Sequence, residues 1–202
     1  MTSMPALVEK SLTSSAAGAV PPAVPSAAMW LPASALNCYE ADARLRSWLL
    51  TPGLLTERIR AAAGSGFRMQ VLHEGRMQAE HVREITMGTA DNLWLFAHTR
   101  IPQSTLQAHA WLTNLGRNTL GEALAARSDL ERAAPRYALL GTQSWVVERA
   151  LREARLPPRN LWVRHSAFHL GNDPFDLYEI FLPAIAAAES LSTSTLPTRT
   201  ET

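Results

Sequence analysis

Two charged residues lie in segments that are otherwise apolar, and they are the strongest candidates for chemistry in this chain. Glu179 belongs to a run at 175–183 that is typical of a β-strand. Side chains alternate between the two faces of a strand, so the other residues on the face of this acid are apolar, namely Phe175, Leu177 and Phe181. A carboxylate there is costly to bury unless another group binds it or the protein uses it.

Arg83 makes a parallel case in a second strand-like run at 81–87, where it shares a face with Ile85 and Met87. One inward acid and one inward base indicate a small polar site in an apolar pocket, suited to binding a charged small molecule and to proton transfer. A buried ion pair between Arg83 and Glu179, or a strand register that turns both charges outward, explains the same pattern. The pattern alone favours these structural explanations.

Other reactive side chains give weaker signals. His98 and Arg100 share a face of a third expected strand and could bind an anion, although a solvated edge explains them equally well. His165 and His169 are four residues apart in an expected strand, which places them too far apart for a shared metal ion. Cys38 is the only cysteine. It excludes an intrachain disulfide and a cysteine-based zinc site, and no partner for a nucleophile is implied near it.

The composition is that of an ordinary globular domain. The chain has 202 residues, 47% of them hydrophobic and 18% charged, with a formal net charge of +1. This length supports one domain with a sizeable core, and the charge balance does not require nucleic acid or an anionic membrane as partner. The sequence has no glycine-rich phosphate loop and no apolar stretch long enough to span a bilayer. We therefore expect no cofactor, no metal and no membrane insertion.

Low-complexity segments flank the expected domain. Residues 1–36 are rich in alanine and proline, and we expect a disordered tail rather than a signal peptide, because prolines interrupt its apolar stretch. One folded domain is expected over 37–187, followed by a flexible tail over 188–202. The lone cysteine fits a reducing cytoplasm.

The hydrophobic period changes repeatedly along the domain between that of a helix and that of a strand, which predicts an α+β fold around an antiparallel sheet. Leu45, Trp48 and Leu49 make one helical stripe, for example, and Pro52-Gly53 ends it. The expected helices are 41–50, 54–63, 104–115, 119–125 and 145–154, and the expected strands are 67–74, 81–87, 93–101, 137–140, 161–170 and 175–183.

Short motifs occur in a fixed order over residues 40–184: Trp48-Leu49-Leu50 with Thr56 and Arg58, Val82-Arg83-Glu84-Ile85, Trp94-Leu95 through Thr99 to Pro102, Ser104-Thr105-Leu106, Leu115-Gly116, Thr119-Leu120-Gly121, and Trp162 through Glu179-Ile180-Phe181-Leu182-Pro183. Together they resemble the chorismate lyase family. The resemblance implies a single α+β domain with a six-stranded antiparallel sheet, flanked by helices and by helical flaps over an internal pocket.

The resemblance also implies a carbon–oxygen lyase that eliminates pyruvate from chorismate to give 4-hydroxybenzoate, the first committed step of ubiquinone biosynthesis. By this resemblance, Arg83 would bind the ring carboxylate and Glu179 would contact the other end of the ring. Leu55 and Leu120 would bind through the backbone. The reaction needs orientation and charge placement rather than a metal or redox cofactor.

The contact to the second carboxylate of chorismate is less defined. The family often has arginine where this chain has His98, so His98 and Arg100 are the expected candidates. Glu179 could act as base, as electrostatic partner, or only as a positioning group in a concerted retro-ene transfer.

An alternative function is a non-catalytic small-acid binder, similar to the effector domains of GntR-type regulators. Here, however, no helix-turn-helix pattern precedes the domain. We expect a cytoplasmic monomer with chorismate and 4-hydroxybenzoate as its partners.

Overall fold

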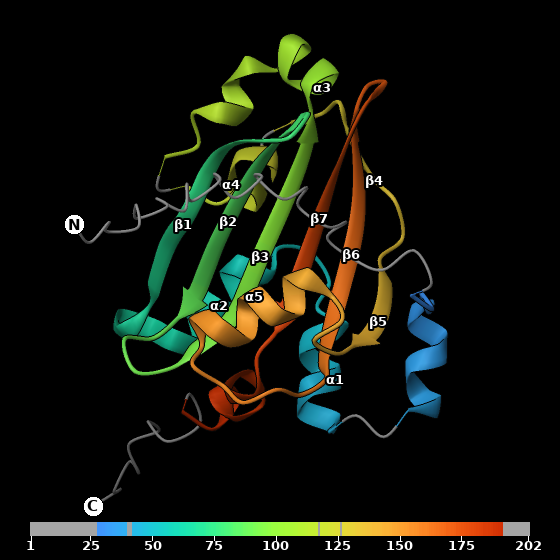
Figure 1. Ribbon diagram of the computed structural model, residues 1–202. Helices are drawn as coiled ribbons and strands as arrows, with labels where there is room; N and C mark the ends of the chain where they lie inside the picture. The colour runs from blue at the N-terminus through green and yellow to red at the C-terminus, as the bar shows by residue number, and fades with distance from the viewer. Residues whose placement is uncertain (1–27, 40–41, 117, 126, 192–202) are drawn as a thin grey trace, which may run out of the picture.

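The computed structural model describes four stretches of the chain: residues 28–39, 42–116, 118–125 and 127–191. The outer parts of both expected tails, before residue 28 and after residue 191, lie outside them. The described residues form the expected α+β fold, in which one antiparallel sheet carries helices on both faces (Figure 1).

Seven strands make up the sheet, in the order β1-β2-β3-β7-β6-β4, with β5 also paired to β6. β4 pairs with the end of β6 near Leu170, whereas β5 pairs with the beginning near Leu161. Six strands were expected, and the seventh is the short β4. The strands are β1 (Arg68–Met77), β2 (Glu80–Gly88), β3 (Leu93–Pro102), β4 (Leu130–Arg132), β5 (Arg136–Leu140), β6 (Leu161–Leu170) and β7 (Asp173–Phe181).

The helices form two layers around the sheet. Figure 1 shows α5 in front of the strands and α2 and α4 behind them. No helix in the described part of the chain is long and apolar enough to cross a membrane. The helices are η1 (Ala33–Cys38), α1 (Ala43–Leu49), α2 (Leu55–Ala63), η2 (Gly64–Gly66), α3 (Gln103–Ala108), η3 (Ala110–Thr113), α4 (Leu120–Ala125), α5 (Trp145–Glu153) and η4 (Pro183–Leu191).

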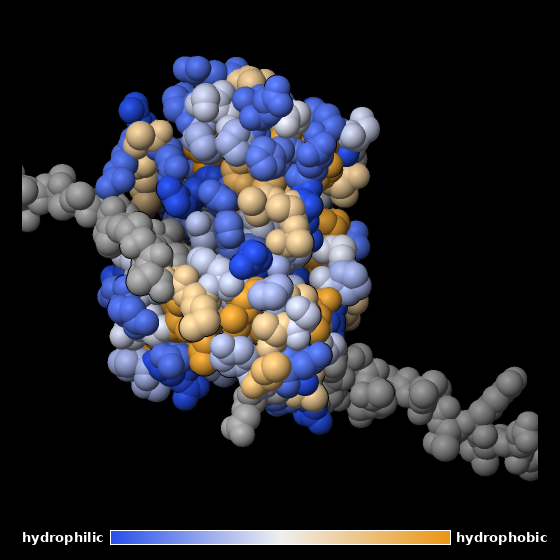
Figure 2. Space-filling view, turned by 90° about the vertical axis from the view of Figure 1, so that its right-hand side faces the viewer, coloured by the Kyte–Doolittle hydropathy of each residue, from blue (hydrophilic) through white to orange (hydrophobic). Residues whose placement is uncertain are grey.

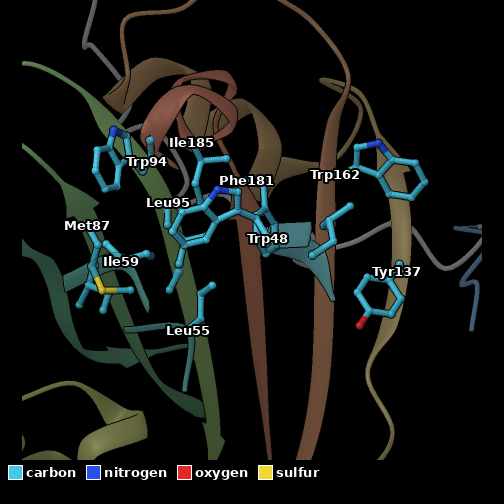
Figure 3. Close-up of a cluster of buried hydrophobic side chains, with 14 of the residues drawn as sticks. Trp48, Leu55, Ile59, Met87, Trp94, Leu95, Tyr137, Trp162, Phe181 and Ile185 are labelled. Atoms are coloured by element: carbon cyan, nitrogen blue, oxygen red, sulfur yellow. The ribbon is translucent and has the colours of Figure 1, made fainter. Parts of the chain in front are cut away.

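A large hydrophobic cluster holds α1, α2 and η4 against the sheet. Trp48 of α1 and Ile59 of α2 are fully buried in it, together with Phe181 of β7 and Ile185 of η4 (Figure 3). Burying side chains of this size stabilises the fold by roughly 2 to 3 kcal/mol each. This packing anchors the first residues of α2 over the inner face of the sheet.

The helix expected over 104–115 is interrupted. His109 has φ −129° and ψ 59°, a non-helical conformation, so the segment divides into α3 and η3. His109 Nε2 lies 3.0 Å from Asp173 Oδ2 at the start of β7. The break between α3 and η3 therefore coincides with a contact to a strand that is distant in sequence. The helical spacing of Trp111 and its neighbours does not reveal this contact.

The described segment that precedes α1 lies against the sheet, although the sequence placed residues 28–36 in the N-terminal tail. Leu31 exchanges two backbone hydrogen bonds with Tyr137 of β5, at 2.7 and 2.9 Å. Leu36 of η1 is fully buried. Leu31 and Leu36 thus belong to the packed structure.

The face of the sheet beneath α5 contains a buried charged cluster around Glu84. This acid is 1% exposed, and its two carboxylate oxygens lie 3.1 Å from His98 Nδ1 and 3.2 Å from Arg149 Nε. Burial acts to raise the pKa of Glu84, but His98 and Arg149 outweigh it and hold the pKa below its ordinary value. The carboxylate is therefore stabilised in its charged form.

Because the pKa of Glu84 is depressed on folding, its stabilising contribution is present above the ordinary value of 4.5 and is lost as the pH falls through the lower folded value. We expect Glu84→Gln to reduce the free energy of unfolding at neutral pH by about 1 to 3 kcal/mol. The difference in free energy of unfolding between Glu84→Gln and the wild type should become smaller in acid. Urea denaturation at pH 7 and below pH 4.5 measures this difference, and a difference that does not change with pH would contradict the stabilising role of the charged Glu84.

Candidate active site

A cavity lies between the sheet and the first turns of α2 and α4, on the face opposite α5. It contains about 870 Å³ not filled by atoms, part of which is open to solvent. Most of its wall is apolar. The charged residues of the wall come from four different strands: Arg83 from β2, Arg132 from β4, Arg164 from β6 and Glu179 from β7.

Arg83 is 2% exposed and lines the cavity. Its Nη2 donates to the carbonyl oxygens of Gly116 and Asn118, at 2.8 and 3.0 Å, and so holds the segment that leads into α4. Nη1 lies 2.6 Å from Glu74 Oε2. That contact is an ion pair rather than an aligned hydrogen bond, since both Nη1 and Nε lack a hydrogen-bond acceptor among the described residues. Arg83 therefore keeps N–H groups that an anion could use.

Glu179 pairs with an arginine that the sequence reasoning did not single out. Arg164 Nε and Nη2 donate to the two carboxylate oxygens, at 2.6 and 2.9 Å, while Nη1 donates to the carbonyls of Leu49 and Thr51. Burial opposes the charge of Arg164, which is 1% exposed, but the Glu179 carboxylate outweighs it and raises the pKa of the guanidinium. The pair is bidentate and buried, the strongest kind of charged hydrogen bond in proteins.

Arg83 and Glu179 are thus each paired with another described residue rather than with each other. Their strands are separated by β3, which places the two backbones two strand spacings, roughly 10 Å, apart. Ala97 and Thr99 of β3 line the cavity between them. The ion pair between Arg83 and Glu179 that the pattern favoured is not formed, and Arg164 supplies the cation for Glu179 instead.

Leu55 and Leu120 are the first residues of the two helices that cover the cavity, and both line it. α4 begins with a capping box in which Thr119 Oγ1 accepts from the Glu122 N–H and the Glu122 carboxylate accepts from the Thr119 N–H. Leu54 precedes α2 without such a side-chain cap. Backbone contacts from these positions remain a prediction.

The two covering helices also touch each other. Arg60 Nη2 of α2 lies 2.8 Å from Glu122 Oε1 of α4, and both side chains are partly exposed. Gly121 of α4 lies so near Leu54 that an added Cβ would be 3.0 Å from its Cδ2. A larger residue at Gly121 would therefore require the Leu54 side chain to shift, so the glycine permits the close approach of these two segments.

His98 and Arg100 do not reach the cavity. They alternate with Ala97 and Thr99 along β3, so they lie on the face beneath α5. There His98 pairs with Glu84, and Arg100 forms two bonds to Glu80 at 2.7 and 3.0 Å. The contact to a second carboxylate that we expected from these residues is not supported by their positions.

Arg164 and Arg132 are the cavity residues that sequence reasoning missed. Arg164 shares its face of β6 with Trp162 and Ser166, so the test that identified Arg83 could have found it. Arg132 offers no such signal, because β4 has only three residues and two of them are exposed. No group of three or more metal-ligating side chains occurs in the described residues. The cavity is suited to a small anion with an apolar ring.

Comparisons with known proteins identify one family. A sequence profile described as chorismate lyase matches residues 24–190. A Hamiltonella defensa protein named chorismate pyruvate-lyase is 32% identical over 154 residues, covering 68% of this chain and 77% of its own. A protein of Shewanella sp. (strain MR-4), named "Probable chorismate pyruvate-lyase", is 31% identical over 155 residues, covering 71% of this chain and 81% of its own.

Solved structures give a weaker likeness. The ligand-binding domain of a GntR-family transcriptional regulator from Bordetella bronchiseptica superposes with a TM-score of 0.40 at 10% identity, over 58% of this chain and 83% of that domain. A similarity at this level carries no argument about function.

Proposed function

This chain belongs to the chorismate lyase family, and on that premise we propose that it eliminates pyruvate from chorismate to leave 4-hydroxybenzoate. The observation that carries the proposal is the placement of Arg83 and the Glu179–Arg164 pair on one cavity wall, separated by β3. Arg83 would bind the ring carboxylate, and Glu179 would accept a hydrogen bond from the C4 hydroxyl para to it. Leu55 and Leu120 would add backbone contacts.

The reaction removes the C4 hydrogen and breaks the bond between C3 and the ether oxygen, which makes the ring aromatic. Both oxygens of Glu179 already accept from Arg164, and each keeps a lone pair for the hydroxyl. Removal of a proton by Glu179 would work against the bidentate guanidinium. We therefore favour a concerted transfer, in which the methylene carbon of the enolpyruvyl group takes the C4 hydrogen and Glu179 fixes the ring.

Turnover of chorismate by the purified full-length chain tests this function. We expect pyruvate and 4-hydroxybenzoate in equal amounts, and an Arg83→Ala or Glu179→Gln protein that stays folded should lose about 10²-fold or more in kcat/KM. Near-normal kcat/KM in both variants would refute the assignment. In the same assay, chorismate deuterated at C4 should give pyruvate with deuterium in its methyl group, whereas removal of a proton by a base would release the label to water.

The covering helices bear on how the product leaves. Because α2 and α4 are in contact over the cavity, we expect their separation to widen the exit for 4-hydroxybenzoate, so slow release and product inhibition are part of the proposal. We propose a monomer as the working unit. Cys38 is free and exposed, which supports a reducing compartment such as the cytoplasm, where the product would serve ubiquinone synthesis.

A further inference from the structure

We propose that Arg132 binds the carboxylate of the enolpyruvyl group and thereby distinguishes the substrate from the product. The inference rests on the proposed function and deepens it. Chorismate carries two carboxylates, whereas 4-hydroxybenzoate keeps only the ring carboxylate. A residue that contacts the second carboxylate therefore contributes to substrate binding and leaves product binding almost unchanged.

Arg132 is the one cavity arginine without a carboxylate partner among the described residues. Arg83 lies beside Glu74, and Arg164 is engaged by Glu179. The Nη2 of Arg132 donates instead to a neutral acceptor, Ser166 Oγ, at 2.8 Å. Its remaining N–H groups can take a bidentate carboxylate.

The location of Arg132 matches the position of the second carboxylate. Ser166, to which it is bonded, lies two residues from Arg164 on the inner face of β6, and Arg164 pairs in register with Glu179. Arg132 therefore stands on the Glu179 side of the cavity. In chorismate the ether at C3 is adjacent to the hydroxyl at C4, so a ring with its hydroxyl at Glu179 directs the enolpyruvyl group toward this side.

The electrostatic surroundings of Arg132 also favour an anion. Arg132 taken as a whole residue is exposed, but its guanidinium reaches the cavity wall at the buried Ser166. Burial at that end lowers the pKa of Arg132, and the positive charge of Arg164 lowers it further. Glu179 acts in the opposite direction but is already neutralised by its bidentate pair. A carboxylate beside Arg132 would relieve the repulsion between the two arginines. Figure 2 views the molecule from the side of β4 and β5, and hydrophilic and hydrophobic residues are mixed on that face.

The test compares two ligands and four proteins. The ligands are 4-hydroxybenzoate and its derivative with a carboxymethoxy group at C3, which restores the second carboxylate on an ether oxygen. The proteins are the wild type, Arg132→Gln, Arg132→Lys, and a control, Arg136→Gln. Arg136 is an exposed arginine of β5 that donates to the Trp30 carbonyl and does not line the cavity. Calorimetry gives the dissociation constants, and pyruvate release gives kcat/KM for chorismate.

We expect Arg132→Gln to reduce the affinity for the derivative by about 10- to 100-fold, which corresponds to the loss of one charge-assisted contact. It should lower kcat/KM for chorismate by a similar factor. Its affinity for 4-hydroxybenzoate should stay within about threefold of the wild type, and Arg136→Gln should match the wild type throughout. Arg132→Lys keeps the positive charge but lacks the planar, bidentate donors of the guanidinium, so it should recover part of the lost affinity for the derivative.

Three results would overturn the inference. If Arg132→Gln binds the derivative and turns over chorismate as well as the wild type does, Arg132 is not the anchor, although the proposed function stands. If Arg132→Gln reduces the affinity for 4-hydroxybenzoate as much as the affinity for the derivative, Arg132 maintains the shape of the cavity and does not bind the second carboxylate. A wild-type protein that releases no pyruvate refutes the proposed function itself, and the inference with it.

Discussion

Replacing Arg164 with methionine is expected to lower the free energy of unfolding by about 3 to 5 kcal/mol, a large part of the stability of an ordinary domain. The substitution leaves Glu179, which is 5% exposed, as a buried charge without its cation. It also removes the donor for the carbonyls of Leu49 and Thr51. Because Thr51 lies just before α2, the loss should also loosen the entry to that covering helix.

A second substitution in the same protein separates stability from activity. Arg164→Met combined with Glu179→Leu should recover most of the lost stability, since apolar residues can replace a buried ion pair at little net cost. Turnover of chorismate should not return, because the proposed acceptor for the hydroxyl is gone. Chemical denaturation and pyruvate release measure the two effects, with Arg136→Met as the control for loss of an exposed arginine. A fully stable Arg164→Met protein would contradict the buried pair.

Removing Arg83 is expected to abolish the preference of the cavity for a negatively charged ring substituent. Wild-type protein should bind 4-hydroxybenzoate about 10- to 100-fold more tightly than the neutral 4-hydroxybenzamide, because two charge-assisted bonds are lost with the amide. In Arg83→Ala the two affinities should become similar, with kcat/KM for chorismate reduced by about 10²-fold or more.

The comparison of acid and amide is needed because Arg83 has a second role. Its Nη2 donates to the carbonyls of Gly116 and Asn118 before α4. Removing Arg83 should therefore loosen that segment and reduce the affinity for both ligands. Only the ratio of the two affinities reports the carboxylate contact. Arg83→Lys keeps the charge without the planar fork and should restore part of that ratio. A ratio unchanged in Arg83→Ala would place the ring carboxylate elsewhere.

Sequence reasoning recovered the parts of the fold that repeat with a clear period. Six of the seven strands and the helices at α1, α2, α4 and α5 follow from alternation or from helical spacing. Arg83 and Glu179 were found in the same way, since a charged residue in an apolar strand face is visible without a structure. Both do line the cavity.

The remaining site residues depend on information that a single strand does not contain. His98 looked equivalent to a cavity residue until the register of β3 against β2 placed Thr99, not His98, opposite Arg83. A shift of one residue moves a side chain to the other face, so a face assignment requires the neighbouring strand. Arg132 lies in a three-residue strand, which is too short for any period to emerge.

β4 and β5 pair with opposite ends of β6 and so share one edge of the sheet. β4 is three residues long and pairs only with the far end of β6, so substitutions there leave the other ladders intact. Arg132 is its last residue, while Arg83 and Glu179 lie in the centre of the sheet. If Arg132 binds the second carboxylate as proposed, substitutions in β4 should therefore change which ring substituent the cavity accepts with less effect on how the ring is held.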